Sequence, residues 1–394
     1  MSIVTGMTPT QIAALSTQQI KDLGTADFKA MTTSQIAALS SSTANTAQIA
    51  AIETEDLVVL STSQVQALQL YNSSGGLTTS QVQALTTAQI KALTGTQFAE
   101  FQTEDMAAML ADQLKAIDVS DVASLTNTQL QALDTTQFKE LTTAQIAGLS
   151  SSQLTSLSTD YFAAMTTDQM RAMSTDAIKA LSFGAGSQLA AIGTTGLASL
   201  TTSQIAALST DQVASLTTLA NGQIAALSTL QIAALSTDAV SKLSTGASGQ
   251  IAALSSAQIG ALTTSQIRAL TTGATGQIAA IQTADIAGLT TSQIAALTTA
   301  QVQAFTTLGT GQLAAMSTSQ IRAFTTAQIN AMGTDQINAL SAAATGQLAA
   351  LSTSQIQALN TNQIFAMSNN AGGRITALTS DQIRLIRRFT PNVT

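Results

Sequence analysis

Carboxylates are the side chains in this sequence with the clearest capacity for chemistry. Glu53, Glu55 and Asp56 lie within four residues of one another, and Glu104 directly precedes Asp105. Paired carboxylates can divide the roles of general acid and general base. Both groups fall at positions that recur along the chain, where a carboxylate more simply caps a helix or stays in solvent. We therefore predict no catalytic residue.

Other motifs for catalysis or ligand binding are missing. The chain has no His and no Cys, which excludes a Ser-His-Asp triad, a thiolate nucleophile and a His-ligated metal. No D-x-[DN]-x-[DN]-G calcium loop and no GGxGxD repeat occurs. The segments GAGSQ at Gly184 and GATGQ at Gly273 lack the Lys of a phosphate-binding loop. We expect their glycines to occupy turns with positive φ, and we predict no cofactor-binding and no metal-binding residue.

Composition indicates a folded chain with few charges. Of 394 residues, 45% are apolar and 9% are charged, so the chain has enough apolar surface for a core. The formal net charge of −7 disfavours binding to nucleic acid. No apolar run reaches the roughly 18 residues of a transmembrane helix. The opening MSIVTG has neither the basic nor the apolar region of a Sec signal.

An eight-residue repeat runs through the sequence and must position all of these side chains. The unit TTSQIAAL occurs unchanged at Thr32, Thr201 and Thr290. With its last residue as the anchor, 44 such units, here called octads, run from Met7 to Ile386. Thirty-five of them are eight residues long, and the other nine carry one, three or five extra residues.

The spacing of apolar residues predicts one short helix per octad. Within an octad the apolar residues alternate at spacings of three and five. Eight residues of uninterrupted α-helix turn through about 800°, so successive octads would rotate their apolar pair by about 80°. That drift excludes one long helix or a coiled coil, and strand alternation is missing.

Residues at the octad junctions are those that start helices. The first position is nearly always Ser or Thr, which predicts an N-cap. The fourth is usually Gln, so each junction resembles a capping box, and Pro9 falls at the first helical position. Low complexity alone would not place cap residues selectively at one position. Common substitutes at the first position are Gly24, Asp118, Asp134, Gly193, Gly333 and Asn360; Asp replaces Gln at Asp27, Asp56, Asp105, Asp121 and Asp285.

Helices of five or six residues are unstable alone and must stack. We therefore predict an all-α solenoid of short N-capped helices, with Ile, Leu and residues such as Met165, Met170 and Met173 in the core. From Leu181 onward seven octads carry three extra residues, and successive insertions lie 27 or 35 residues apart, or three or four octads. This alternation predicts about 3.5 octads per superhelical turn.

Differences along the chain suggest three regions. Residues 1–181 form a regular, more charged octad solenoid; residues 182–386 form a solenoid with insertions; residues 387–394 form a C-terminal cap or tail. Sixteen of the 21 acidic residues precede Leu181, whereas Arg384, Arg387 and Arg388 gather at the C-terminus. Only Tyr71 to Gly76 resembles a linker. A basic end opposite a weakly capped, acidic N-terminal zone favours end-on stacking.

TTSQIAAL, TTAQIKAL and STDQVASL resemble the TTxQIxAL octapeptide arrays of large proteobacterial surface or secreted proteins, often labelled adhesin-like or haemolysin-like. The resemblance covers nearly the whole chain, transfers no catalytic residue, and implies an extracellular or cell-surface location. Without glycine-aspartate nonapeptides, the chain departs from the calcium-binding haemolysin pattern.

We expect a non-enzymatic structural protein: the subunit of a filament, sheath or surface layer, or an adhesin stalk. It would be exported without an N-terminal Sec signal and would self-associate by end-on and lateral contacts, with no nucleic-acid partner. The alternative is a surface-binding module that presents its regular Ser and Thr hydroxyls to ice or glycan.

Overall fold

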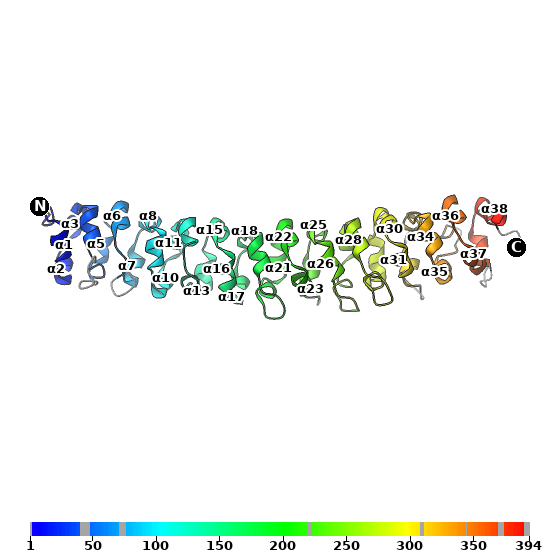
Figure 1. The fold of residues 1–394 in the computed structure, drawn as a ribbon, viewed down its shortest axis with the longest axis horizontal. Helices are drawn as coiled ribbons and strands as arrows, with labels where there is room; N and C mark the ends of the chain where they lie inside the picture. The colour runs from blue at the N-terminus through cyan, green and yellow to red at the C-terminus, as the bar shows by residue number, and fades with distance from the viewer. Residues whose placement is uncertain are drawn as a thin grey trace. The chain divides into compact units, whose positions relative to one another are not determined.

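The computed structural model describes residues 2–39, 48–70, 76–218, 222–307, 311–343, 345–368 and 374–389. Throughout these residues the chain forms short helices joined by tight turns, with no strand (Figure 1). The chain divides into two compact units. Unit 1 comprises residues 1–182 and 186–192, and unit 2 comprises residues 183–185 and 193–394. The predicted all-α solenoid with one short helix per octad is confirmed.

Unit 1 contains α1 (Pro9–Ala13), α2 (Thr17–Lys21), α3 (Thr25–Ala30), α4 (Thr33–Ala38), α5 (Thr54–Leu57), α6 (Thr62–Ala67), α7 (Thr79–Ala84), α8 (Thr87–Ala92), α9 (Gly95–Ala99), α10 (Thr103–Ala108), α11 (Ala111–Ala116), α12 (Val119–Val122), α13 (Asn127–Ala132), α14 (Thr135–Lys139), α15 (Thr143–Gly148), α16 (Ser151–Ser156), α17 (Thr159–Ala164), α18 (Thr167–Ala172), α19 (Thr175–Ala180) and α20 (Gln188–Ala191).

Unit 2 contains α21 (Gly193–Ser199), α22 (Thr202–Ala207), α23 (Thr210–Ala214), α24 (Gln223–Ala226), α25 (Thr229–Ala234), α26 (Thr237–Ser241), α27 (Ser256–Ala261), α28 (Thr264–Ala269), α29 (Gln277–Ala280), η1 (Thr283–Gly288), α30 (Thr291–Ala296), α31 (Thr299–Gln303), α32 (Gln312–Ala315), α33 (Thr318–Arg322), α34 (Thr326–Ala331), α35 (Thr334–Ala339), α36 (Thr353–Gln357), α37 (Thr361–Ser368), η2 (Arg374–Ala377) and α38 (Ser380–Phe389).

Junction chemistry explains why each helix starts where it does. In α1, the Thr8 side chain accepts from the Gln11 backbone N–H, and the Gln11 side chain accepts from the Thr8 N–H, with Pro9 at the first position. The same reciprocal box starts α4, α22 and α30, the helices of the three identical TTSQIAAL units. Many of the helices end at an apolar anchor such as Leu39, the residue after α4, whose extended backbone cannot continue the helix. The predicted capping boxes are therefore present.

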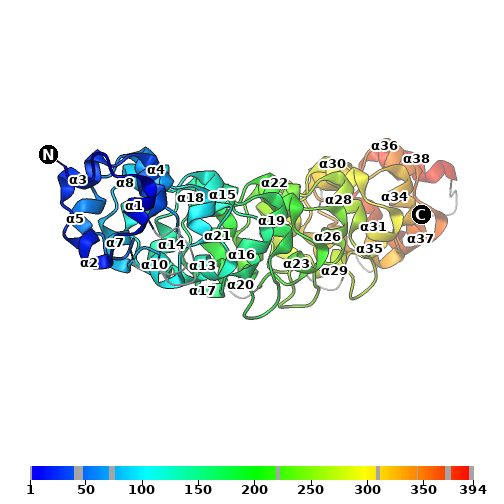
Figure 2. The same ribbon diagram turned by 60° about the vertical axis from the view of Figure 1, so that its left-hand side comes forward.

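Helices three octads apart pack against one another. In unit 1, α10 contacts both α7 and α13; in unit 2, α22 contacts α25, and α31 contacts α34. The apolar positions meet inside each unit, where Ile205 is 1% exposed and Leu208 is 5% exposed. Met165, Met170 and Met173 are buried at the same positions, as predicted. Figure 2 shows the helices of each unit from a second side.

Candidate functional site

The fourth residue of the octad is the most distinctive polar group in the structure. Gln266, only 1% exposed, uses both ends of its amide. Its Oε1 accepts from the backbone N–H of Thr263 at 2.7 Å, which closes the capping box of α28. Its Nε2 donates to the carbonyl oxygens of Ile232 at 3.0 Å and Leu235 at 2.7 Å. One buried amide therefore starts its own helix and binds the end of another.

The second helix always belongs to the octad four before. Gln113 donates to the Leu85 carbonyl oxygen, 28 residues earlier, at 2.7 Å. The Gln266 to Leu235 bond spans 31 residues because one three-residue insertion intervenes. Gln250 reaches Leu216 across 34 residues, because two insertions intervene. We call these glutamines the glutamine ladder. Helices pack against helices three octads away, whereas the glutamine side chains bond to helices four octads away. Both separations bracket the predicted superhelical turn of about 3.5 octads.

Helix physics explains why the ladder has these acceptors. The last carbonyl groups of a helix have no intrahelical donor, and a helix of six residues is mostly ends. A buried carbonyl without a donor is costly, so each short helix needs donors from elsewhere. The ladder glutamine of the octad four later supplies them, and the repeat thereby satisfies its own backbone.

Tyr161 replaces a ladder glutamine and keeps the donor. Its hydroxyl lies 2.7 Å from the Leu133 carbonyl oxygen and 3.0 Å from that of Gln131. Leu133 is 28 residues earlier, the ordinary ladder step. Burial, together with the nearby Asp134 and Asp160 carboxylates, raises the pKa of Tyr161, so the phenol keeps its proton for this bond.

Aspartates at the fourth position behave differently from glutamines. Asp105 accepts from the Gln102 backbone N–H at 3.0 Å, and Asp27 accepts from Gly24 at 3.3 Å, so these two close their boxes as predicted. The prediction is wrong for Asp56, which closes no box at α5, and for Asp121 and Asp285. The carboxylates of Asp121 and Asp285 instead accept from the backbone N–H groups of Gly95 and Ser256, in octads three before their own.

The arrangements at Asp121 and Asp285 have local causes. Asp is one methylene shorter than Gln, and the Asp121 helix, α12, has only four residues, while Asp285 lies in the 3₁₀ helix η1. Gly95 permits the approach of Asp121, since a Cβ at Gly95 would lie 3.1 Å from Asp121 Oδ1 and 2.9 Å from Ser124 Oγ.

Burial perturbs several of these carboxylates. It raises the pKa of Asp105, with a further contribution from Glu104. It also raises the pKa of Asp56, with help from Glu55 and Glu53. The two carboxylate groups considered for acid and base chemistry therefore each contain one buried member. Both buried carboxylates, Asp56 and Asp105, are the fourth residues of their octads, so the repeat pattern accounts for their positions.

A second set of bonds joins octads on the surface. Where the sixth residue of an octad has a polar side chain, it can donate forward to the backbone of the octad three later. Arg268 Nε lies 3.0 Å from the Ala296 carbonyl oxygen, and Asn330 Nδ2 lies 2.8 Å from that of Ala358. In unit 1, Lys115 follows the same step to the side chain of Glu140, at 2.6 Å. The bond to Glu140 raises the pKa of Lys115.

The three-residue insertions lie inside a stretched capping box. Thr271 and Gln277 are six residues apart, yet the Thr271 N–H donates to Gln277 Oε1 and the Gln277 N–H donates to Thr271 Oγ1, both at 3.0 Å. Ser244 and Gln250 repeat the arrangement. Gly184, Gly186 and Gly273 have positive φ as predicted, but Gly276 has φ of −74° as the N-cap of α29, so the prediction is wrong there. The insertions therefore project without disturbing the ladder.

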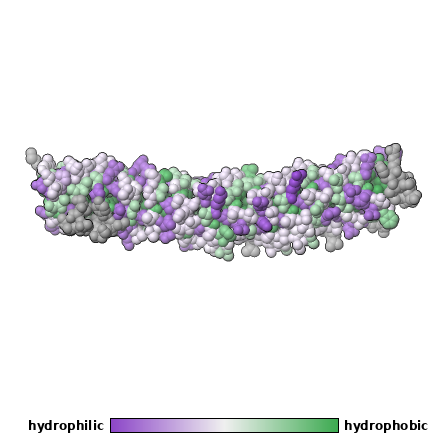
Figure 3. All heavy atoms as spheres, in the orientation of Figure 1, coloured by the Kyte–Doolittle hydropathy of each residue, from purple (hydrophilic) through white to green (hydrophobic). Residues whose placement is uncertain are grey.

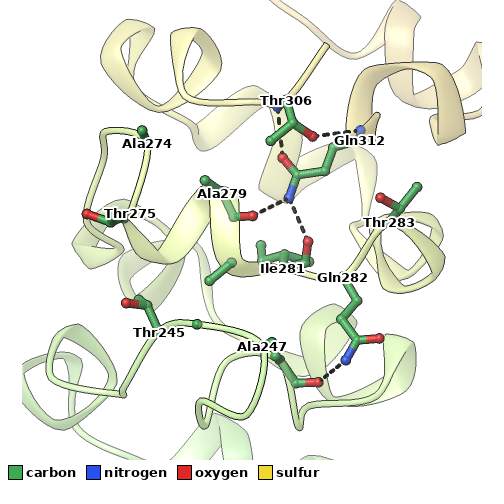
Figure 4. Close-up of a pocket in the computed structure, with 14 residues that line it drawn as sticks. Thr245, Ala247, Ala274, Thr275, Ala279, Ile281, Gln282, Thr283, Thr306 and Gln312 are labelled. Atoms are coloured by element: carbon green, nitrogen blue, oxygen red, sulfur yellow. Dashed lines mark hydrogen bonds between the residues drawn. The ribbon is translucent and has the colours of Figure 1, made fainter. Parts of the chain in front are cut away.

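Two neighbouring insertions form an open cavity of about 590 Å³ in unit 2 (Figure 4). The loops 244–249 and 271–276 lie on the same side of the unit in Figures 1 and 2. The lining is uncharged, and its two amides already have partners: Gln282 donates to Ala252, and Gln312 donates to Ile281. The lining offers no titratable group for catalysis.

Other residues considered from the sequence are dispersed. Among the described residues, no group of three acidic side chains comes together as a metal site would need. No helix formed by the described residues is both long enough and apolar enough to cross a membrane. Residues 71–75 of the suggested linker, and the side chains of Arg387 and Arg388, lie outside the described residues. The three-region division of the chain stays a prediction.

The donor role of the glutamine was missed from the sequence, although a signal for it exists. Glu serves a capping box as well as Gln does. Yet no octad carries Glu at the fourth position. Glu has no N–H to donate, so the choice of Gln over Glu, the residue of the same length, is a signal that the amide nitrogen is used; the few octads with Asp at this position forgo that donor.

Comparison with known families agrees with this architecture. No curated protein matches the chain significantly. The model of the ALTTAQ repeat matches residues 4–41, 130–167, 187–218, 247–272, 274–307 and 308–342, which together make up more than half of the sequence. The six letters of its name correspond to the residues at an octad junction, for example Ala84 to Gln89, from the end of one helix to the ladder glutamine of the next. The chain belongs to the ALTTAQ repeat family.

Proposed function

We propose that this repeat protein is a non-enzymatic, extracellular structural protein, the subunit of a filament, sheath or surface layer, or the stalk of an adhesin. The observation that carries the proposal is the glutamine ladder. The most frequent buried polar side chain is committed, at both ends of its amide, to joining octads. A chain built this way gains length and cooperativity from each added octad.

The surface supports the same role. The face in Figure 3 is mostly of intermediate hydropathy, with small polar and apolar areas interspersed. Exposed large apolar side chains such as Leu230 and Phe365 are few among the described residues. Such a surface suits a spacer or a polymer subunit that meets its neighbours over a limited area.

Negative-stain electron microscopy and sedimentation velocity of the purified 394-residue chain test the proposal. We expect filaments or oligomers whose amount rises with protein concentration. Monomers alone, over a wide range of salt and protein concentrations, would contradict it.

Exposed hydroxyl groups support a second candidate, a module that binds ice or glycan. In many octads the residue after the cap is a Ser or Thr that is free of the capping box and exposed, as at Thr33, Thr202 and Thr291. Thermal hysteresis or saturable binding on a glycan array would favour this candidate, and the absence of both would remove it.

A further inference from the structure

The ladder position of α10 in unit 1 holds a carboxylate where the next octad holds an amide. Gln113, in α11, donates to the Leu85 carbonyl oxygen, 28 residues earlier. The same step from Asp105 leads to Leu77, and no described residue donates to the Leu77 carbonyl oxygen. An ionised carboxylate cannot donate a hydrogen bond. This ladder position therefore has an acceptor but no donor while Asp105 is ionised.

Asp105 is held in the same way as a ladder glutamine. Its side chain is buried, and its Oδ2 accepts from the Gln102 backbone N–H at 3.0 Å. Gln113 closes its own box with Oε1, which accepts from the Leu110 N–H at 2.8 Å, and its remaining atom, Nε2, donates to the octad four before. The remaining atom of Asp105 is Oδ1, which accepts from no described residue. Oδ1 is therefore the atom that corresponds to the missing donor.

The other aspartates at the fourth position are held differently. Asp27 is partly exposed, and its second oxygen, Oδ1, already accepts from the Ile3 N–H at 2.8 Å. Asp56 is buried but closes no box. Two further aspartates accept from octads three before their own. Among the described residues, Asp105 alone is buried, closes its box and keeps one carboxyl oxygen in reserve.

No cation near Asp105 stabilises its ionised form. The α10 helix packs against α7 and α13, and neither of these helices contains Asp, Glu, Lys or Arg. The charge that acts on Asp105 is the Glu104 carboxylate of the same helix, which together with burial raises the pKa of Asp105. As the pH falls, Asp105 is therefore protonated in the folded protein before it would be in the unfolded chain.

We propose that Asp105 is an acid-operated member of the glutamine ladder: once protonated, its carboxyl group donates through Oδ1 to the Leu77 carbonyl oxygen while Oδ2 still closes the capping box. The proton comes from solvent. Because Asp is one methylene shorter than Gln, the bond draws α10 toward the preceding turn of unit 1. Unit 1 is thereby tightened in acid and loosened at neutral pH, a regulation that does not depend on assembly into filaments.

Carbon-13 NMR of the full chain, labelled at the leucine backbone carbonyl groups, observes the acceptor directly. The Leu77 signal is assigned by its loss in Leu77→Ile. We expect this signal to move downfield as the pH falls from about 7 to about 4.5, just above the ordinary pKa of aspartate. In Asp105→Gln the signal should lie at the downfield position at both pH values, because an amide donates at either. A Leu77 signal that stays fixed in the wild type would overturn the proposal, since protonation would then only relieve a buried charge.

Hydrogen exchange of α10 measures the consequence for local stability. In the full chain, mass spectrometry follows peptides that cover residues 103–108, with rates divided by those of unstructured peptides at the same pH. Protection should rise at least about fivefold between pH 7 and 4.5, as one net hydrogen bond requires. Asp105→Gln should show the higher protection at both pH values, whereas Asp112→Asn, at an exposed aspartate of the next octad, should keep the wild-type rise. An equal rise in Asp105→Gln would show that another group senses the pH and would contradict the proposal.

Discussion

Gln266 donates its side-chain amide to the carbonyl oxygen of Leu235 at 2.7 Å, across 31 residues and four octads. The same amide closes the capping box on Thr263. The capping box of one helix and the hydrogen bond to another helix thus depend on the same side chain, which explains how helices of four to six residues are stable in the folded protein. Each helix is nucleated by its cap and held at its C-terminal carbonyl groups by another turn of the solenoid.

Replacing Gln266 with Glu separates the two functions of the amide. The capping acceptor remains, but the Ile232 and Leu235 carbonyl oxygens lose their donor and face a buried negative charge. We expect unit 2 to lose about 3 kcal/mol or more of unfolding free energy, measured by urea titration followed by circular dichroism. The control is Gln19→Glu at the exposed end of the ladder, which should change stability by less than about 0.5 kcal/mol. Equal effects at the two sites would mean that the donor contributes nothing.

The caps can be tested within one of the identical units. Thr201 Oγ1 accepts from the Gln204 N–H at 3.2 Å, whereas its neighbour Thr202 follows the cap and is exposed. Thr201→Ala should cost about 1 kcal/mol in the same urea titration. Thr202→Ala should be nearly neutral, and a similar loss from both substitutions would refute the cap assignment.

The raised pKa of Asp105 predicts how the stability of unit 1 depends on pH. Burial raises its pKa in the folded protein, so the folded state binds the proton more tightly than the unfolded chain does. Ionised Asp105 therefore lowers the unfolding free energy. This loss is complete at pH values above the pKa of Asp105 in the folded protein, and it disappears as the pH falls to the pKa of an aspartate in the unfolded chain, about 3.9.

Asp105→Asn should therefore stabilise unit 1 at neutral pH and give a gain that shrinks on acidification. Urea midpoints at several pH values measure it. Asp112→Asn, an exposed aspartate of the next octad, is the matched control and should leave the midpoints nearly unchanged. A gain from Asp105→Asn that grows as the pH falls would show that the sign is wrong.

Deleting an insertion should leave the solenoid intact. Without Gly273, Ala274 and Thr275, the remaining TTGQIAAI is an ordinary octad whose Thr271 and Gln277 can form the usual box. The expected change in unfolding free energy is within about 1 kcal/mol, because a short surface loop contributes little. Deleting three residues from a helix instead, Ile294 to Ala296, removes core and should unfold the region. Loss of helix by circular dichroism in the loop deletion would show that the insertion holds the ladder together.

Much of this fold could be predicted from sequence because its determinants are local. N-caps such as Thr201 and the proline at Pro9 are recognisable from neighbouring residues alone, and the spacing of insertions indicated the superhelical period. Hydrogen bonds over 28 or more residues were not predictable in that way. The burial of Gln266 and the ladder role of Tyr161 appear only when octads four apart come together. The different behaviour of Asp121 and Asp285 likewise depends on which octad faces each carboxylate.

The glutamine ladder is the central claim, and exchange of glutamine side-chain amide protons tests it most directly. The measurement follows hydrogen exchange by NMR in protein labelled with ¹⁵N at glutamine side chains only. We predict a large population of amide groups that exchange at least about 100-fold more slowly than free glutamine, because their protons are bonded to buried carbonyl oxygens. A small rapid population should include Gln11 and Gln19, assigned by substitution. Uniformly rapid exchange of all glutamine side chains would contradict the ladder.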